Sequence, residues 1–224
     1  MPRETQRDVF LESEGDAWFA RNREALDSAT RFERDAIVDA IGEIVASPLA
    51  PTGTARLLEI GASSGRRLEV LGQDGRIEAH GIEPSQAAVD VAIERGLKVV
   101  RGTADTLPYE ARSFDIVAFG FCLYLCDDDD LFRIAAEADR VLKDGGWIVI
   151  QDFYASTPVR RAYHHRAGLQ SRKMDYRQLF AWHPRYVCLS HAVRHHVTGT
   201  YTDEPGEWVA TAVLRKAPPA DDVQ

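Results

Sequence analysis

An apolar run that stops at two glycines four residues apart constrains this chain more than any other feature. Residues 57–66 read Leu-Leu-Glu-Ile-Gly-Ala-Ser-Ser-Gly-Arg, which predicts a buried strand that turns directly into a helix. Gly61 can adopt a positive φ and lets a ligand approach the backbone, whereas Gly65 lets the helix pack closely on the sheet. This strand–turn–helix unit indicates a site for a nucleotide-like ligand.

The spacing of the glycines discriminates between nucleotide cofactors. A dinucleotide-binding turn reads G-x-G-x-x-G and cradles a pyrophosphate. Here Ala62, Ser63 and Ser64 separate the two glycines, and the middle glycine is missing. The spacing therefore disfavours NAD, and with it an NAD(P)-dependent oxidoreductase as the function.

A second apolar strand supplies the next element of the predicted site. Residues 77–82 are followed by Glu83, which stands 22 positions after Gly61. In a doubly wound sheet the neighbouring strand ends beside the sugar of the ligand, where a carboxylate accepts hydrogen bonds from both ribose hydroxyls. We expect Glu83 to play this part.

Five motifs follow one another between residues 55 and 152. They are Glu59-x-Gly61-x-x-x-Gly65, Gly81-Ile82-Glu83-Pro84-Ser85, Gly102-Thr103-Ala104-Asp105-Thr106-Leu107-Pro108-Tyr109, Ser113-Phe114-Asp115-Ile116-Val117 and Leu142-Lys143-Asp144-Gly145-Gly146. In this order and with these gaps, the chain resembles the class I S-adenosylmethionine-dependent methyltransferases that act on small molecules. The resemblance implies S-adenosylmethionine as the cofactor and S-adenosylhomocysteine as its product.

The resemblance also implies which residues hold the cofactor. They are Glu59, Gly61, Ala62, Ser63, Gly65, Glu83, Pro84, Thr103, Ala104, Asp105, Phe119 and Gly120. In many members an aspartate just before the position of Ala104 accepts the adenine amino group, but this chain has Thr103 there. Either Asp105 takes this role, or adenine is recognised by the backbone around Thr103 and Ala104.

The order of the predicted elements defines the fold class. Strands near 56–60, 77–83, 97–101, 114–119 and 146–152 alternate with helical patterns, and strand candidates at 186–193 and 207–214 follow. Such alternation predicts an α/β, Rossmann-like, doubly wound and mostly parallel sheet. We expect seven strands, with a C-terminal antiparallel hairpin, in a single domain over residues 1–224 whose cofactor-binding core is 55–152.

Residues 1–50 are predicted to form a helical cap, because apolar side chains repeat at helical spacing from Phe32 to Val45 and an amphipathic piece precedes them. In small-molecule members of the family such a cap often covers the cofactor. Its candidate contacts are Trp18 or Phe19 over the site and Arg21 or Asn22 at the methionine carboxylate. Alternatively, the two aromatic side chains only anchor the helix to the core.

Composition restricts the location and the partners. The N-terminal residues are charged, no apolar run is long enough to span a bilayer, and the net charge is -8. A cytoplasmic protein that binds neither membranes nor nucleic acid is therefore expected. Cys122, Cys126 and Cys188 are interpreted as reduced core residues.

The charge is uneven along the chain. Residues 158–177 contain six basic residues and one acidic residue, so this segment carries +5 and the remainder -13. A basic segment after the fifth strand suggests an anionic acceptor, although a solvated helix face is an equally good interpretation. We predict a substrate-recognition segment over 153–205, with a disordered tail at 217–224. The acceptor-binding candidates of the substrate-recognition segment are Tyr154, Arg160, Arg161, Arg166, Arg172 and Lys173.

Methyl transfer from a sulfonium is an in-line displacement that depends mainly on alignment. A hydroxyl or ammonium acceptor also needs a base, and six of the seven histidines follow residue 153. We expect His164 or His165, on a helix, to be the base, with Tyr163 as a hydrogen-bonding neighbour. Asp152, Tyr154 or solvent are the alternatives.

No metal site is predicted. Adjacent histidine pairs lack the usual spacing of zinc ligands, and the four aspartates 127–130 are interpreted as the N-cap and first turn of a helix. The sequence thus favours methyl transfer to an O or N atom of a small anionic metabolite, such as a saccharide or a natural-product intermediate. A non-catalytic S-adenosylmethionine-binding module is a further alternative, and the acceptor and the oligomeric state stay open.

Overall fold

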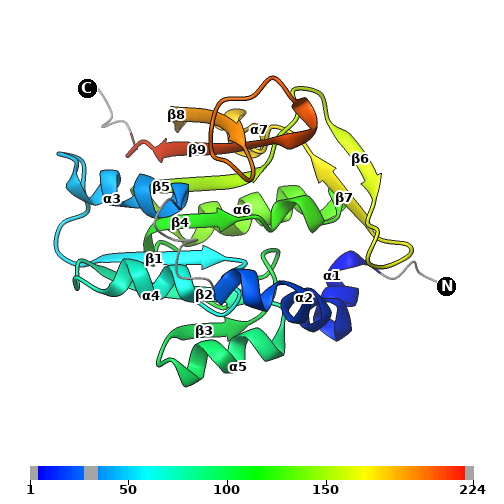
Figure 1. The fold of residues 1–224 in the computed structure, drawn as a ribbon. Helices are drawn as coiled ribbons and strands as arrows, with labels where there is room; N and C mark the ends of the chain where they lie inside the picture. The colour runs from blue at the N-terminus through cyan, green and yellow to red at the C-terminus, as the bar shows by residue number, and fades with distance from the viewer. Residues whose placement is uncertain (1–4, 28–34, 220–224) are drawn as a thin grey trace.

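The computed structural model describes residues 5–27 and 35–219, and its main feature is one seven-stranded sheet (Figure 1). The strands lie in the order β3-β2-β1-β4-β5-β9-β8. Their bounds are β1 (Ala55–Ile60), β2 (Ile77–Glu83), β3 (Lys98–Arg101), β4 (Phe114–Gly120), β5 (Leu142–Phe153), β8 (Tyr186–His195) and β9 (Trp208–Lys216). The first five are parallel, and β9 is antiparallel to both β5 and β8. The predicted fold class is confirmed.

Helices cover both faces of the sheet. The helices α3 (Ala36–Ala46), α4 (Arg66–Gly72) and α5 (Gln86–Glu94) share one apolar cluster with the sheet, and α6 (Leu131–Val141) and α7 (Gln178–Ala181) share the other. Side chains on a strand alternate between faces. Ile116 accordingly packs toward the first layer and Val117 toward the second, and both are fully buried.

A helical cap and a small hairpin lie at one end of the sheet, the end toward which β1 and β4 run (Figure 1). The cap consists of α1 (Gln6–Val9), a π-helical turn (Phe10–Glu14) and α2 (Gly15–Asp27). The hairpin pairs β6 (Val159–Ala162) with β7 (Gln170–Lys173). Because the carboxyl ends of parallel strands are where ligands bind in such sheets, both elements are placed over a potential site.

The cap is shorter than the predicted 1–50 segment. Helix α3 packs against the sheet through Ile37 and Ile41, so it belongs to the helix layer. Phe32, with which the predicted helical pattern began, lies outside the described residues, as do residues 220–224 of the predicted tail. Among the described residues, no helix is both long and apolar enough to cross a membrane.

Two local expectations were wrong, and a third is only partly met. His164 and His165 occupy the turn between β6 and β7 and not a helix. Asp130 is the N-cap of α6 as predicted, but its side chain makes no capping hydrogen bond. Asp127 accepts a hydrogen bond from the Gln6 amide at 2.7 Å. Cys188 is exposed on the edge strand β8 rather than in the core.

A buried ion-pair network joins three elements below the cofactor turn. The Arg67 guanidinium at the start of α4 contacts Glu59 of β1 and Asp35, and Asp35 also caps α3 by accepting from the Ile37 and Val38 amides. The Arg67 side chain is 11% exposed, and those of the two carboxylates less. Burial alone would lower the pKa of Arg67, but the charges of Glu59 and Asp35 outweigh it and raise this pKa.

Replacing Arg67 with Met should therefore destabilise the protein strongly, because two carboxylates would stay buried without their cation. The expected loss in the free energy of unfolding is about 3 to 5 kcal/mol. Arg66→Met is the matched control, since Arg66 makes only a partly exposed i,i+3 pair with Glu69. Urea unfolding compares the two variants, and equal losses would show that the network contributes no more than a surface pair.

Candidate cofactor and acceptor site

A cavity lies between the cap and the carboxyl ends of β1, β2, β3 and β4. It encloses about 860 Å³ of space together with the solvent at its mouth. Its lining comes from the cap, from the ends of these four strands and the turns after them, and from the start of α6: Arg7, Phe10, Gly15, Trp18, Ile60, Gly61, Ile82, Glu83, Pro84, Gly102, Thr103, Ala104, Asp105, Gly120, Phe121, Cys122, Leu125, Cys126, Asp127, Asp130 and Ile134.

The turn after β1 has the conformation that its glycines predict. Gly61 has a φ of 77°, and a Cβ built on it would lie 2.7 Å from the Cys122 Cβ. Gly65 has a φ of 74°, and a Cβ there would meet Leu97 at 2.6 Å. Both positions therefore need glycine for backbone conformation and for space. Ala62, Ser63 and Gly65 shape this turn without lining the cavity.

Glu83 is the most informative polar group in the cavity wall. Its carboxylate accepts hydrogen bonds from the Ser63 amide at 2.9 Å and the Ser85 amide at 3.0 Å, one on each oxygen. Burial raises the pKa of Glu83 to about 7, against the opposing effect of these two bonds. Each oxygen keeps a further lone pair, so the carboxylate suits a ligand with two neighbouring hydroxyls.

Glu59 lies beneath the floor of the same cavity. A Cβ on the cavity-lining Gly120 would come within 3.3 Å of Glu59 Oε1. That oxygen accepts from Arg67, whereas Oε2 is buried and has no partner among the described residues. Burial raises the pKa of Glu59, although the charge of Arg67 opposes the shift. An unpartnered carboxylate oxygen here fits the ammonium of a methionine moiety.

At the opposite end of the cavity, Asp105 pairs with a residue of the cap. Arg7 Nη1 lies 2.9 Å from Asp105 Oδ2. Burial alone would raise the pKa of Asp105, but hydrogen bonds from Thr103 and Arg7 lower it. Thr103, Ala104 and Asp105 all line the cavity, so both predicted modes of adenine recognition remain available.

Of Trp18 and Arg21, two cap residues predicted to contact the cofactor, only Trp18 lines the cavity. Its Nε1 donates to the Tyr124 hydroxyl at 3.3 Å. Arg21 is not part of the lining, because it pairs with Glu14 and donates to the Tyr163 hydroxyl. Phe119 is not part of it either: its fully buried ring packs in the core, since alternation along β4 turns residue 119 away from the cavity.

The predicted catalytic residues are not brought to the cavity. His164 and His165 are exposed in the β6–β7 turn, and neither lines it. Tyr163 is buried under the cap against Val9 and Leu169. The placement of these three side chains gives no support to the predicted base.

Asp152 has a structural position. It is 1% exposed at the end of β5 and accepts hydrogen bonds from the amides of Leu123 at 2.8 Å and Tyr124 at 3.3 Å. Burial raises the pKa of Asp152 to about 7. Its carboxylate therefore fixes the turn after β4, which carries the cavity-lining Phe121 and Cys122.

The basic residues of the hairpin are partly neutralised. Arg160 and Arg172 both pair with Asp128, and Arg166 donates to the Ser13 hydroxyl at 2.7 Å. Lys173 lies over the Phe153 ring at 4.8 Å. Within the described residues, neither Lys173 nor Arg161 makes an ion pair with a carboxylate. Tyr154 packs against Trp208 and His191 at the base of the hairpin.

Several cavity residues were missed by the sequence analysis. Arg7 and Phe10 precede the amphipathic piece that signalled the cap, so no periodicity marked them. Phe121 has a φ of 53°, which is rare for a bulky residue and is found where a chain turns sharply at a site. Its position just after the apolar strand β4 was the only available signal.

Comparison with known proteins finds a similarity to methyltransferases in the central part of the chain. A profile described as a methyltransferase domain matches residues 58–150. An uncharacterised protein of Mycobacterium tuberculosis is 33% identical over 122 residues, which are 54% of this chain and 40% of that protein. A demethylmenaquinone methyltransferase of Oceanobacillus iheyensis is 32% identical over 105 residues, 43% of this chain and 42% of that enzyme. The match thus spans about two fifths of each relative.

The fold is shared with solved structures. A Burkholderia thailandensis 1,6-didemethyltoxoflavin-N1-methyltransferase, solved with 1,6-didemethyltoxoflavin and S-adenosylhomocysteine, superposes with a TM-score of 0.68 at 16% identity, over 97% of this chain and 92% of that one. Residues 58–150 thus match a methyltransferase domain, and nearly the whole chain shares its fold with the Burkholderia enzyme. The Burkholderia enzyme binds S-adenosylhomocysteine, and the cavity of this chain has groups that would fit such a ligand.

The raised pKa of Glu83 predicts how nucleoside binding depends on pH. The ribose hydroxyls donate to the ionised carboxylate, so affinity should be full above pH 7 and fall by about tenfold per pH unit well below it. Adenosine is the probe, because it lacks the amino acid groups that would interact with Glu59. Calorimetry of Glu83→Gln should show weaker and pH-independent binding. A pH dependence that survives in this variant would assign the titration to another group.

Proposed function

We propose that the protein transfers the methyl group of S-adenosylmethionine to an O or N atom of a small anionic acceptor. The observation that carries this proposal is the buried Glu83 carboxylate, held by two backbone amides beside the Gly61–Gly65 turn in the wall of an open cavity. The match of residues 58–150 to a methyltransferase domain and the S-adenosylhomocysteine bound to the structurally similar Burkholderia enzyme support it. In this chain, Glu83 would hold the ribose and Glu59 the methionine ammonium.

The acceptor would bind on the side of the cavity that faces β5 and the hairpin. Phe121 lines the cavity, and its ring lies 5.4 Å from that of Phe153, which in turn lies 5.0 Å from that of Tyr124. These three half-buried rings form an aromatic wall beside the end of β5. Such a wall suits a small acceptor with a planar part.

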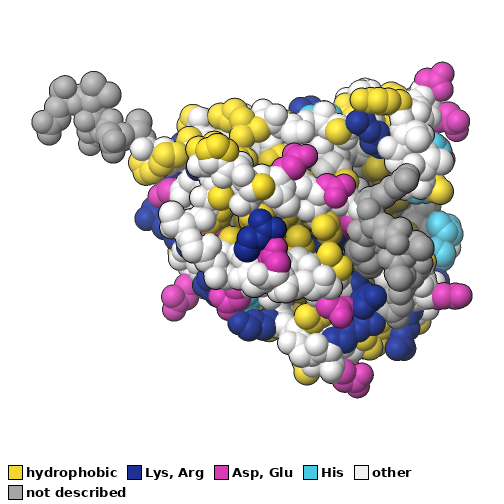
Figure 2. Space-filling view, turned by 60° about the vertical axis from the view of Figure 1, so that its left-hand side comes forward, with side chains coloured by type: hydrophobic (Ala, Val, Ile, Leu, Met, Phe, Trp, Pro, Cys, Tyr) yellow, Lys and Arg dark blue, Asp and Glu magenta, His cyan; other side chains and the backbone are white. Residues whose placement is uncertain are grey.

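The charge on this wall supports an anionic acceptor. Burial lowers the pKa of Lys173, and the positive charge of Arg161 lowers it further, while Glu207 opposes the shift. Two cations close enough to disfavour each other create a local positive potential, which an acceptor carboxylate or phosphate would relieve. Arg161 and Lys173 are therefore the residues of the basic hairpin that we assign to the acceptor. Elsewhere charges of both signs are interspersed, as on the face in Figure 2.

The proposed activity is tested with radiolabelled S-adenosylmethionine and a panel of small hydroxylated and aminated carboxylic acids and sugar phosphates. We expect label in at least one acceptor, with loss of turnover in Glu83→Ala, because two charge-assisted hydrogen bonds are removed and affinity falls at least about tenfold. Binding of S-adenosylhomocysteine without turnover of any acceptor would favour the non-catalytic module. Tighter binding of NAD than of S-adenosylhomocysteine would favour an NAD(P)-dependent oxidoreductase instead.

Neutralising the two hairpin cations should weaken acceptor binding selectively. Arg161→Met combined with Lys173→Met is expected to raise the acceptor KM about tenfold or more, with a smaller effect at high salt and unchanged affinity for S-adenosylhomocysteine. Arg185→Met is the matched control, because Arg185 pairs with Asp144 at the start of β5. An unchanged KM in the double variant would mean that these cations are solvated surface groups that do not contact the acceptor.

A further inference from the structure

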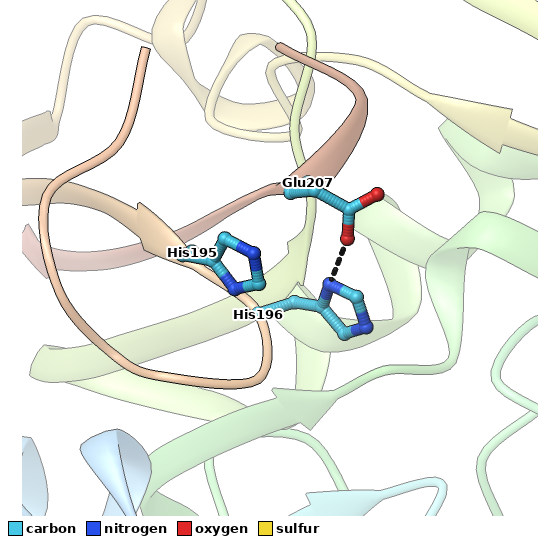
Figure 3. A group of neighbouring side chains, drawn as sticks. All are labelled: His195, His196 and Glu207. Carbon is cyan, nitrogen blue, oxygen red and sulfur yellow. Dashed lines mark ion pairs between the residues drawn. The ribbon is translucent and has the colours of Figure 1, made fainter. Parts of the chain in front are cut away.

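A histidine–carboxylate pair stands where β8 ends and β9 begins (Figure 3). His196 Nδ1 lies 2.7 Å from Glu207 Oε2, and the two side chains are 37% and 38% exposed. The backbone reinforces the pair, because the His196 amide donates to the Glu207 carbonyl at 2.9 Å. A ring that donates its Nδ1 proton to a carboxylate keeps a free lone pair on Nε2 in its neutral form.

His195 completes a group of three potential ligands, whose ligand atoms lie within 4.8 Å of one another. Its hydrogen bonds argue against a cation there. The Val197 and Thr198 amides donate to His195 Nδ1 at 3.1 and 3.4 Å. In the neutral ring the proton therefore sits on Nε2, which has no lone pair to offer a metal ion. The geometry favours an isolated His196–Glu207 pair over a metal centre.

The pair lies next to the aromatic wall of the acceptor side. The His196 ring is 5.9 Å from the Phe153 ring, which separates it from the cavity-lining Phe121. The charged and titratable groups around the pair are Lys173, which lies over Phe153, and His195, whose ring is 5.5 Å from that of His196. His196 does not itself line the cavity. Unlike His164 and His165, it is next to the aromatic wall, so it would serve an acceptor whose reacting atom lies between Phe121 and Phe153.

We propose that His196, oriented by Glu207, is the general base of the methyl transfer. This inference rests on the proposed function. As the acceptor atom bonds to the methyl carbon and the carbon–sulfur electron pair returns to sulfur, the acceptor's proton passes to His196 Nε2, directly or through one water. The carboxylate of Glu207 fixes the ring tautomer and stabilises the charge on the protonated imidazole. The proton then leaves to solvent.

The tautomer of His196 can be measured without any acceptor. Nitrogen-15 NMR of the labelled full-length protein above neutral pH should show His196 protonated on Nδ1. In Glu207→Gln this preference should disappear, whereas in the control variant His183→Gln it should persist. A His196 ring protonated on Nε2 in the wild-type protein would overturn the proposal. So would a zinc-induced shift of the His195 and His196 nitrogens together, which would identify a metal centre.

Kinetic measurements test whether His196 acts as the general base. They use an acceptor identified in the panel of small acids and sugar phosphates. His196→Gln should lower kcat by about 10² to 10⁴-fold, abolish the acid limb of the kcat–pH profile and leave S-adenosylhomocysteine affinity unchanged. Glu207→Gln should lower kcat less and shift that limb. His183→Gln should match the wild type. If the wild type is active and His196→Gln retains its kcat, the base lies elsewhere, whereas an inactive wild type would refute the proposed function.

Discussion

The buried guanidinium of Arg67 is the interaction on which the cofactor site depends. It joins the carboxylate at the end of β1 to the residue that caps α3, and its own helix follows the Gly61–Gly65 turn. Charges withdrawn from water are tolerated only when they are paired. The network does not saturate both carboxylates, however, because Glu59 Oε2 is left without a partner. The interactions that hold the turn in place therefore also leave one carboxylate oxygen, Glu59 Oε2, free to accept a hydrogen bond beneath the cavity floor.

The parallel half of the sheet could be predicted because each feature there has a local cause. Buried strands are apolar on both faces, the turns need glycine at particular positions, and Glu83 directly follows its strand. The acceptor side offered no such signals. The strands β6 and β7 carry mostly polar side chains, so the segment was interpreted as helical, and His164 and His165 were placed on a helix.

The His196–Glu207 pair could not be predicted from the sequence either. Eleven positions separate the two residues, and their contact depends on the register of β8 against β9, in which His195 lies opposite Trp208. A bulge near Cys188 shifts that register, and no sequence pattern marks it. Arg7 was missed for a related reason: its pairing with Asp105 follows from how the cap crosses the sheet, which a short helix with little periodicity does not reveal.

The π-helical turn between α1 and α2 sets how these two helices of the cap are rotated relative to each other. Such turns contain one residue more than a regular helix needs, and a single insertion within an ordinary helix can create one. Because one residue corresponds to a rotation of about 100°, the insertion turns α1 relative to α2. Arg7 and Trp18, one on each side of the turn, both line the cavity in this arrangement. Deleting one residue from this turn would keep a helical cap but would rotate Arg7 away from Asp105.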